Sequence, residues 1–371
     1  MNELPPAKAD HEPQWSAPRK PEMYDALLIV GFGGPEGPED VLPFLENVTR
    51  GRGVPRERLL EVAGHYYHFG GKSPINDQCR ALIAALRKEL GEHGMRLPIY
   101  WGNRNWQPFI ADALRQMRED GVRRALAFVI SAYSSYSGCR QYRENIVAAQ
   151  AEIGERAPEV DKLRAFYNHP DFIEAYADRV GQALQQFSHK ERESVRFVAT
   201  AHSIPCSMAQ TSDYEQQLRE TTRLVAERAG FADWDLVYQS RSGSPAQPWL
   251  EPDVIDHLRR AAEQGTRNVL VTPLGFLSDH LEILYDLDVE AATLASELGM
   301  KMIRAESVGT HPMFVGMIRK LIAERMNPDE PRLAIGHFGP RHDFCWANCC
   351  PAPRRAGRPL VSGDQVVLQR P

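Results

Sequence analysis

The stretch PIYWGNRNWQPFIADALRQMREDGVRRALAFVISAY, residues 98–133, runs from one short apolar segment to another through a segment with helical spacing of apolar residues. A second stretch, LVYQSRSGSPAQPWLEPDVIDHLRRAAEQGTRNVLVTPLGF (236–276), follows nearly the same order of strand, turn, Trp, Pro, helix, Gly and strand. Strands that alternate with helices are typical of an α/β fold with parallel sheets. The repetition predicts two similar α/β halves.

Six segments have the near-continuous apolar character of strands that are covered on both faces. These expected strands lie at 26–32, 98–102, 124–133, 195–201, 235–240 and 267–276. Helical spacing in the intervening segments predicts helices that flank the sheets.

The chain divides by pattern into four segments. We expect α/β domains at 24–185 and 186–330 with a cleft between them. Residues 1–23 are rich in Pro and lack an apolar core, which predicts a disordered leader. Residues 331–371 lose periodicity, and we expect a cysteine-containing C-terminal extension with a disordered end.

Composition excludes several classes of protein. The 371 residues carry a formal net charge of -5 with both signs interspersed, which argues against nucleic-acid binding. No apolar run approaches the roughly 20 residues that span a bilayer. These features predict a cytoplasmic protein with no transmembrane segment.

Ligands of open parallel sheets bind beyond the carboxyl ends of the strands. His202 lies there, at the end of the strand in FVATAHSIP, although a lone His is more often a hydrogen-bonded structural residue. GFGGPEG (31–37) follows the first strand but matches neither a dinucleotide nor a phosphate-loop motif, so we interpret it as a tight turn.

Three carboxylates recur in SDHLEILYDLDVE (278–290). Glu282, Asp286 and Glu290 have i, i+4, i+8 spacing, which places them on one face of a helix that Ser278 can cap. A solvated acidic face is one interpretation. The flanking apolar residues favour the other, an enclosed row that passes a divalent cation. His202 and Glu282 both follow strands of the second half, so they can form a metal-handling pair.

The tail stretch HDFCWANCCPAPRR (342–355) places Cys345, Cys349 and Cys350 within six residues. A disulfide framework is not expected in the cytoplasm, where thiols stay reduced. A metal site, with zinc as one candidate, and unligated thiols both remain open, because this spacing matches no standard zinc motif.

The segments GGKSPIN, FVATAHSIP, QPWLEPDV and SDHLEILYDLDVE, in this order, resemble the ferrochelatases, over about Tyr24 to Asn327. The resemblance implies two Rossmann-like, chelatase-type domains around a porphyrin cleft. It implies a lyase that inserts ferrous iron into a porphyrin and releases two protons.

The resemblance also assigns roles to the acidic row and its histidine. It implies that His202 and Glu282 face each other across the macrocycle, bind iron and remove the pyrrole protons. Asp286 and Glu290 match outer positions that relay the metal.

Four more positions match porphyrin contacts of the family: Ser73, Tyr142, Arg50 and Tyr66. Two departures accompany them. Phe32 stands where many relatives have an iron-ligating Tyr, and His65 replaces the Arg of an Arg-Tyr pair.

The segment at 47–74 has arginines and few apolar residues. A cationic rim suits coproporphyrin III, a tetracarboxylate, better than protoporphyrin IX, which remains the alternative substrate. The resemblance is closest to actinobacterial coproporphyrin III ferrochelatases. It implies a product, Fe-coproporphyrin III (coproheme), that feeds haem biosynthesis, and a downstream partner, coproheme decarboxylase. We expect a monomer.

Two rival functions stay open. One is a chelatase that loads cobalt into a sirohydrochlorin-type ring. The other is a haem or iron–sulfur sensor without turnover, against which the complete set of His202, Glu282, Asp286 and Glu290 argues.

Some ferrochelatases hold a 2Fe–2S cluster through one internal Cys and three from the C-terminal extension. The resemblance implies such a cluster on Cys139, in SYSGCRQY, together with Cys345, Cys349 and Cys350. A zinc site on the same four thiolates is the alternative.

Overall fold

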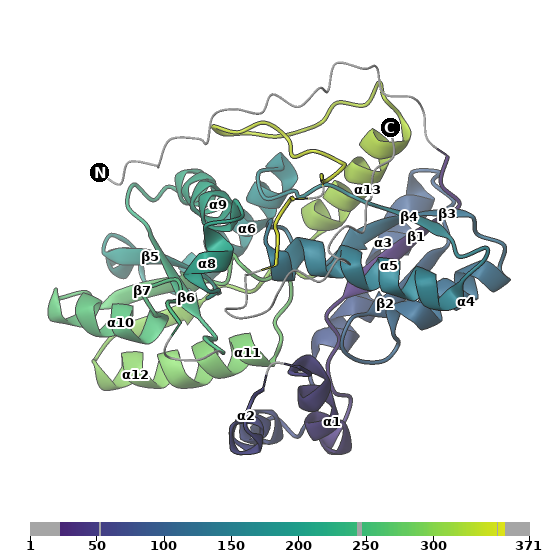
Figure 1. Ribbon diagram of the computed structural model, residues 1–371. Coiled ribbons are helices and arrows are strands. Elements are labelled where there is room, and N and C mark those ends of the chain that lie inside the picture. Colours follow the sequence, from purple (N-terminus) through teal and green to yellow (C-terminus); the bar gives the residue numbers. More distant parts are fainter. Residues whose placement is uncertain (1–22, 52, 243–246, 347, 353–371) are drawn as a thin grey trace.

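The computed structural model describes residues 23–51, 53–242, 247–346 and 348–352 (Figure 1). The predicted leader, apart from Met23, and the predicted disordered end from 353 onward lie outside the described residues.

Each half of the chain alternates strands and helices, and η marks π-helical segments. The first half contains β1 (Ala26–Gly31), α1 (Pro38–Val48), α2 (Arg56–His68), α3 (Ile75–Glu92), β2 (Ile99–Asn103), α4 (Ile110–Glu119), β3 (Arg124–Val129), η1 (Tyr136–Arg140), α5 (Gln141–Ile153), β4 (Glu159–Lys162) and α6 (Pro170–Leu184). The second half contains α7 (His189–Arg192), β5 (Val195–His202), α8 (Cys206–Ala209), α9 (Tyr214–Ala229), β6 (Asp235–Gln239), α10 (Val254–Glu263), β7 (Asn268–Thr272), α11 (Leu281–Ile283), η2 (Leu284–Ala291), α12 (Ala292–Glu297), β8 (Lys301–Arg304) and α13 (Pro312–Met326).

The strands form two four-stranded sheets with orders β2-β1-β3-β4 and β6-β5-β7-β8. The strand pairings of both sheets are parallel. Because the second order repeats the first strand for strand, the predicted pair of similar α/β halves is confirmed.

The six predicted strands are present, and two more were missed. β4 (EVDK) and β8 (KMIR) each pair with one neighbour only, at the edge of a sheet. Edge strands are short and carry charged side chains, which blunts unwanted pairing. The apolar pattern that revealed the other six strands is absent from these two.

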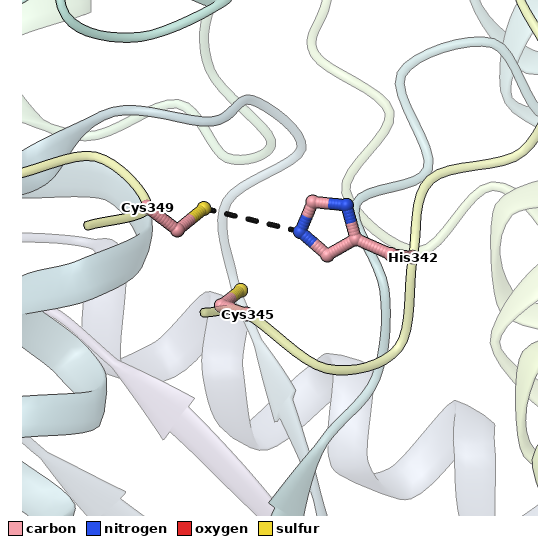
Figure 2. Close-up of side chains that lie close together, drawn as sticks. All are labelled: His342, Cys345 and Cys349. Carbon is pink, nitrogen blue, oxygen red and sulfur yellow. Dashed lines mark hydrogen bonds between the residues drawn. The ribbon is translucent and has the colours of Figure 1, made fainter. Parts of the chain in front are cut away.

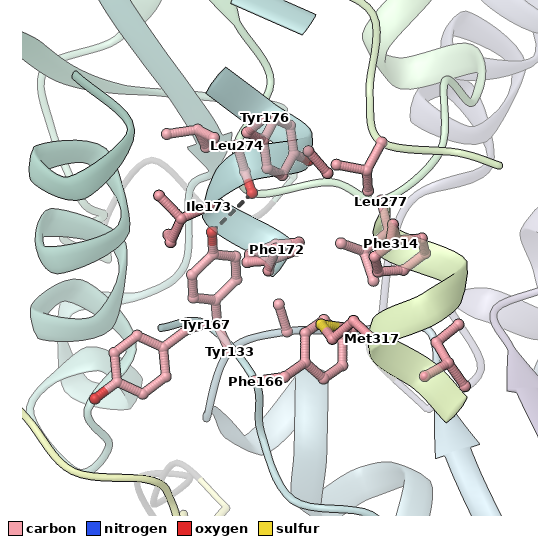
Figure 3. Close-up of a cluster of buried hydrophobic side chains, with 14 of the residues drawn as sticks. Tyr133, Phe166, Tyr167, Phe172, Ile173, Tyr176, Leu274, Leu277, Phe314 and Met317 are labelled. Carbon is pink, nitrogen blue, oxygen red and sulfur yellow. Dashed lines mark hydrogen bonds between the residues drawn. The ribbon is translucent and has the colours of Figure 1, made fainter. Parts of the chain in front are cut away.

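The two halves share one core. Helix α6, from the first half, packs against α9, whereas α13, at the end of the second, packs against α3 and α6. The Tyr133 hydroxyl donates a hydrogen bond to the carbonyl of Leu274 at 2.8 Å, as Figure 3 shows. Burial of each apolar side chain here contributes about 1.5–3 kcal/mol. Packing crosses the expected boundary at residue 186 in both directions, so that boundary stays a prediction.

The C-terminal extension is attached to both halves of the chain. Asn168 donates to the carbonyl of Phe338 at 2.7 Å, and the backbone N–H of His337 donates to the buried carboxylate of Glu220 at 2.6 Å. The described part of the extension reaches the start of α5, where Arg140 donates to the carbonyl of Cys349 at 3.5 Å (Figure 1). Among the described residues, no helix has the length and apolar character to cross a membrane.

Candidate active site and thiol centre

His202 is the last residue of β5, and its ring orientation is fixed locally. Nδ1 lies 2.5 Å from the carbonyl oxygen of Ser203. A carbonyl can only accept, so Nδ1 carries the proton and Nε2 of the neutral ring has a lone pair. Tyr214 donates to the carbonyl of His202 at 2.9 Å and holds this strand end in place.

Nε2 of His202 lies 3.8 Å from Oε2 of Glu282. A macrocycle between the two would need van der Waals contact on both faces, or about 7 Å. The expectation that they face each other across the ring is therefore wrong. They lie side by side because β5 and β7 are neighbours in the sheet, so the segments that follow them leave from the same edge.

The helix that carries Glu282 begins later than expected. His280, not Ser278, is the N-cap, and its Nδ1 accepts a hydrogen bond from the backbone N–H of Glu282 at 3.2 Å. Beyond Ile283 the helix is π-helical over η2. Such segments are rare and are often found at functional sites. The predicted cap at Ser278 and the regular α-helical spacing are both wrong here.

Asp286 is the middle member of the acidic row. Its carboxylate accepts hydrogen bonds from the Ser240 hydroxyl and from Nε2 of Gln239, the latter at 3.2 Å. Burial raises its pKa to about 7, the charges of Glu282 and Glu290 add to the rise, and the two hydrogen bonds limit it. The three carboxylates are thus close enough to interact. Glu290 is at the exposed end of the row, and its pKa is raised by partial desolvation and then by the charge of Asp253.

Of the four expected porphyrin contacts, Tyr66 lies close enough to Glu282 to feel its charge. Burial, and then the charge of Glu282, raises the pKa of Tyr66. Ser73 is buried, and its backbone N–H donates to the carbonyl of Pro35 in the turn after β1 at 2.8 Å. Tyr142 is buried in α5, and Arg50 is exposed in the turn after α1. Their substrate contacts stay predictions.

Sequence reasoning missed Arg104, which follows β2. Its guanidinium lies over the Phe32 ring at 5.8 Å and over the Tyr142 ring at 5.5 Å. Both rings belong to the carboxyl edge of the first sheet, so Arg104 presents a cation there. The position of Arg104 just after a predicted strand was the feature of the sequence that could have identified it. A planar guanidinium of this kind suits carboxylate recognition.

The four expected cluster cysteines lie together. Cys139, in η1, is in hydrogen-bonding contact with Cys345, which together with burial raises the pKa of Cys139. Cys345 lowers the pKa of Cys349, but Cys350 and burial outweigh it and raise this pKa to about 12. The Sγ atoms of Cys349 and Cys350 are 3.9 Å apart. The thiols thus form a continuous chain of neighbours from η1 to the extension.

The structure adds a histidine that sequence reasoning missed. Nε2 of His342 lies 3.8 Å from Sγ of Cys349, and Figure 2 shows the ring pointing at that sulfur. The ligand atoms of His342, Cys345 and Cys349 lie within 4.8 Å of one another, so this group can hold a metal ion. The position of His342, three residues before Cys345, was the feature of the sequence that could have identified it.

Two cations lie near the thiols. Lys162 and Arg143 both act to lower the pKa of Cys139, against the dominant effects of Cys345 and burial. Metal binding requires thiolates, and buried thiolates need compensating positive charge. The donor types, their mutual contact and these cations therefore fit a thiolate-bound metal centre.

The fold is that of metal chelatases, as a comparison with solved structures indicates. "SirB from Bacillus subtilis with Fe3+" superposes with a TM-score of 0.52 at 12% identity, over 84% of this chain and 99% of that one. At this identity the likeness establishes the fold alone.

A model of the Ferrochelatase family matches residues 24–326. A ferrochelatase from Rhodopirellula baltica is 56% identical over 93% of this chain and 97% of its own length. A coproporphyrin III ferrochelatase from Streptomyces coelicolor is 49% identical over 92% of this chain and 96% of its own, and one from Frankia alni is 52% identical over 90% and 88%. The chain belongs to the ferrochelatase family, lyases that act as porphyrin metal chelatases.

Proposed function

We propose that this protein inserts ferrous iron into coproporphyrin III to give coproheme, and that His202 and Glu282 carry the reaction. The observation that carries the proposal is the 3.8 Å separation of His202 Nε2 and Glu282 Oε2. A neutral imidazole nitrogen and a carboxylate oxygen at this distance can bind one divalent ion together. Asp286 and Glu290 then form the outer end of the path by which the ion arrives.

The same two side chains can take up the protons that iron displaces. As Fe²⁺ moves from the pair to the ring nitrogens, the ring loses two protons, which balances the charge. Nε2 of His202 and the carboxylate of Glu282, each vacated by iron, can accept one proton apiece. Because both side chains lie on one side, metal delivery and proton removal occur at the same face of the ring.

The choice of coproporphyrin rests on the cations of the first half. Arg50, Arg56 and Arg58 are exposed in and before α2, and Arg104 lies at the edge of the sheet. Arg56 and Arg58 are paired with Glu46 and Glu61, but exposed pairs are weak and their cations can exchange to substrate carboxylates. A rim of this kind favours a tetracarboxylate over a ring with apolar edges.

An anaerobic absorbance assay with ferrous iron and either coproporphyrin III or protoporphyrin IX tests this function. We expect loss of the free-base spectrum with coproporphyrin III, abolished in His202→Ala. Faster turnover of protoporphyrin IX would overturn the substrate choice. Binding without metal insertion would support the sensor, and insertion of cobalt into a sirohydrochlorin-type ring in preference to iron would support the other rival.

We also propose that Cys139, Cys345, Cys349 and Cys350 hold a 2Fe–2S cluster, which four thiolates satisfy. The cluster would tie the extension to the first half. Cys349→Ser should abolish the visible absorption bands, and Cys206→Ser, a thiol on α8 outside this group, should keep them. Stoichiometric zinc without sulfide in the wild type would support the zinc alternative instead. The decarboxylase partner, the monomeric state and the cytoplasmic location stay predictions.

A further inference from the structure

The thiol centre has one more donor than a 2Fe–2S cluster needs. Four cysteines fill its four ligand positions, and His342 is a fifth group whose Nε2 faces Cys349 Sγ at 3.8 Å. A thiolate has no proton to give, so a hydrogen bond across this contact requires that the imidazole be the donor.

One ring contact and the ion pairs of two neighbouring residues place His342. It packs on Trp346, with ring centroids 4.7 Å apart. Arg341, the residue before His342, forms an ion pair with Asp213 at 2.8 Å. Asp343, the residue after His342, forms an ion pair with Arg332 at 3.3 Å. The packing on Trp346 and the ion pairs of the two adjacent residues therefore position the imidazole.

We propose that His342 is a positioning residue for the metal centre, donating its Nε2–H to the Cys349 thiolate rather than binding iron. This inference rests on the proposed 2Fe–2S cluster. A hydrogen bond to a ligand sulfur withdraws electron density from it and stabilises the more negative, reduced form of the centre. The donor thus raises the reduction potential of the metal centre. It also sets the orientation of the Cys349 side chain toward that centre.

A redox titration of the full-length holoprotein, monitored by visible circular dichroism, tests this role. His342→Ala removes the donor, and His342→Gln retains an N–H at similar reach. His337→Ala is the matched control, because His337 attaches the same extension to Glu220 through Nδ1 at 3.1 Å without lying beside a thiol. Iron and acid-labile sulfide are counted in each preparation.

We expect a more negative potential and altered sulfur-to-iron bands in His342→Ala, with His342→Gln and His337→Ala close to wild type. If His342→Ala loses the centre but His342→Gln keeps it with normal bands, the donor role also stands. Loss of the centre in both His342 variants would overturn the proposal by making the imidazole a ligand. So would an unchanged potential in His342→Ala, or an equal shift in His337→Ala. A wild type without iron and sulfide would instead refute the cluster itself.

Discussion

The imidazole of His65 lies flat on the ring of Tyr285, with centroids 3.7 Å apart and 10° between the planes. His65 belongs to α2 in the first half, and Tyr285 to η2 in the second. His68, one turn further along α2, meets the same ring edge-on with centroids 6.3 Å apart. Helix α2, which carries exposed arginines, therefore packs against the helical segment that carries the acidic row.

Loss of this stack should loosen α2. Stacked aromatic pairs contribute on the order of 1 kcal/mol, so His65→Ala should make opening of α2 about fivefold more frequent. Hydrogen exchange of peptides from Arg56–His68 measures this directly. His65→Phe keeps a ring over Tyr285 and should exchange like wild type. Equal protection in all three proteins would show that the stack does not hold the helix.

Removal of the Arg104 cation should weaken porphyrin binding more than the chemical step. A charge-assisted hydrogen bond to a carboxylate contributes about 1.5–3 kcal/mol, so Arg104→Gln should raise KM for coproporphyrin III roughly 10- to 100-fold with a smaller change in kcat. Arg118→Gln, which removes an exposed cation on α4, is the control. The assignment fails if Arg104→Gln lowers kcat alone, or if Arg118→Gln raises KM equally.

The repeat and the apolar strands carried enough information to predict the fold class, because strands buried on both faces leave a continuous apolar trace. β4 and β8 leave none, because each is four residues long and carries charged side chains. The start of the helix at Leu281 depended on His280, a residue that is not among the preferred caps, so Ser278 was the natural choice from sequence.

The sequence named some of the residues that the structure brings together at the candidate site, but it did not predict their arrangement. His202 and Glu282 were expected because each follows a strand, yet their side-by-side placement follows from β5 and β7 being neighbours, which spacing alone does not encode. Arg104 contacts the ring of Tyr142, which is distant in the chain. His342 meets the Cys349 thiol only because the extension turns back on itself between them. Tertiary packing alone makes such contacts visible.

Attachment of the extension should depend on Gly336. Its φ is +86°, and a Cβ there would collide with Oε1 of the buried Glu220 carboxylate. Gly336→Ala should therefore detach the segment around His337, detected as faster proteolysis within the extension and faster loss of visible colour. Gly339→Ala is the matched control, because a Cβ at Gly339 meets nothing within 4 Å. Equal proteolysis of the two variants would contradict this account of the attachment.

The raised pKa of Asp286 should appear as a pH dependence of stability. Its carboxyl titrates near 7 in the folded chain and at an ordinary 3.8 when unfolded. Between these values the folded state binds a proton that the unfolded state does not, so this group's contribution to the free energy of unfolding falls as pH rises from about 4 to about 7, then levels off. Asp286→Asn removes the titration. The stability of the variant relative to wild type should therefore increase across that window.

Urea unfolding of both proteins at pH 5 and pH 8 measures the change, which we expect on the order of 2 kcal/mol, because the partly exposed carboxylate is screened by solvent. Ser240→Ala provides a second test. The Ser240 hydroxyl opposes the rise in the pKa of Asp286, so its removal should move the titration to higher pH. The same proton competes with a divalent cation, so affinity for the ion should increase up to the Asp286 pKa in wild type and much less in Asp286→Asn. A stability difference independent of pH would mean that Asp286 is ionised throughout, and that burial does not control this row.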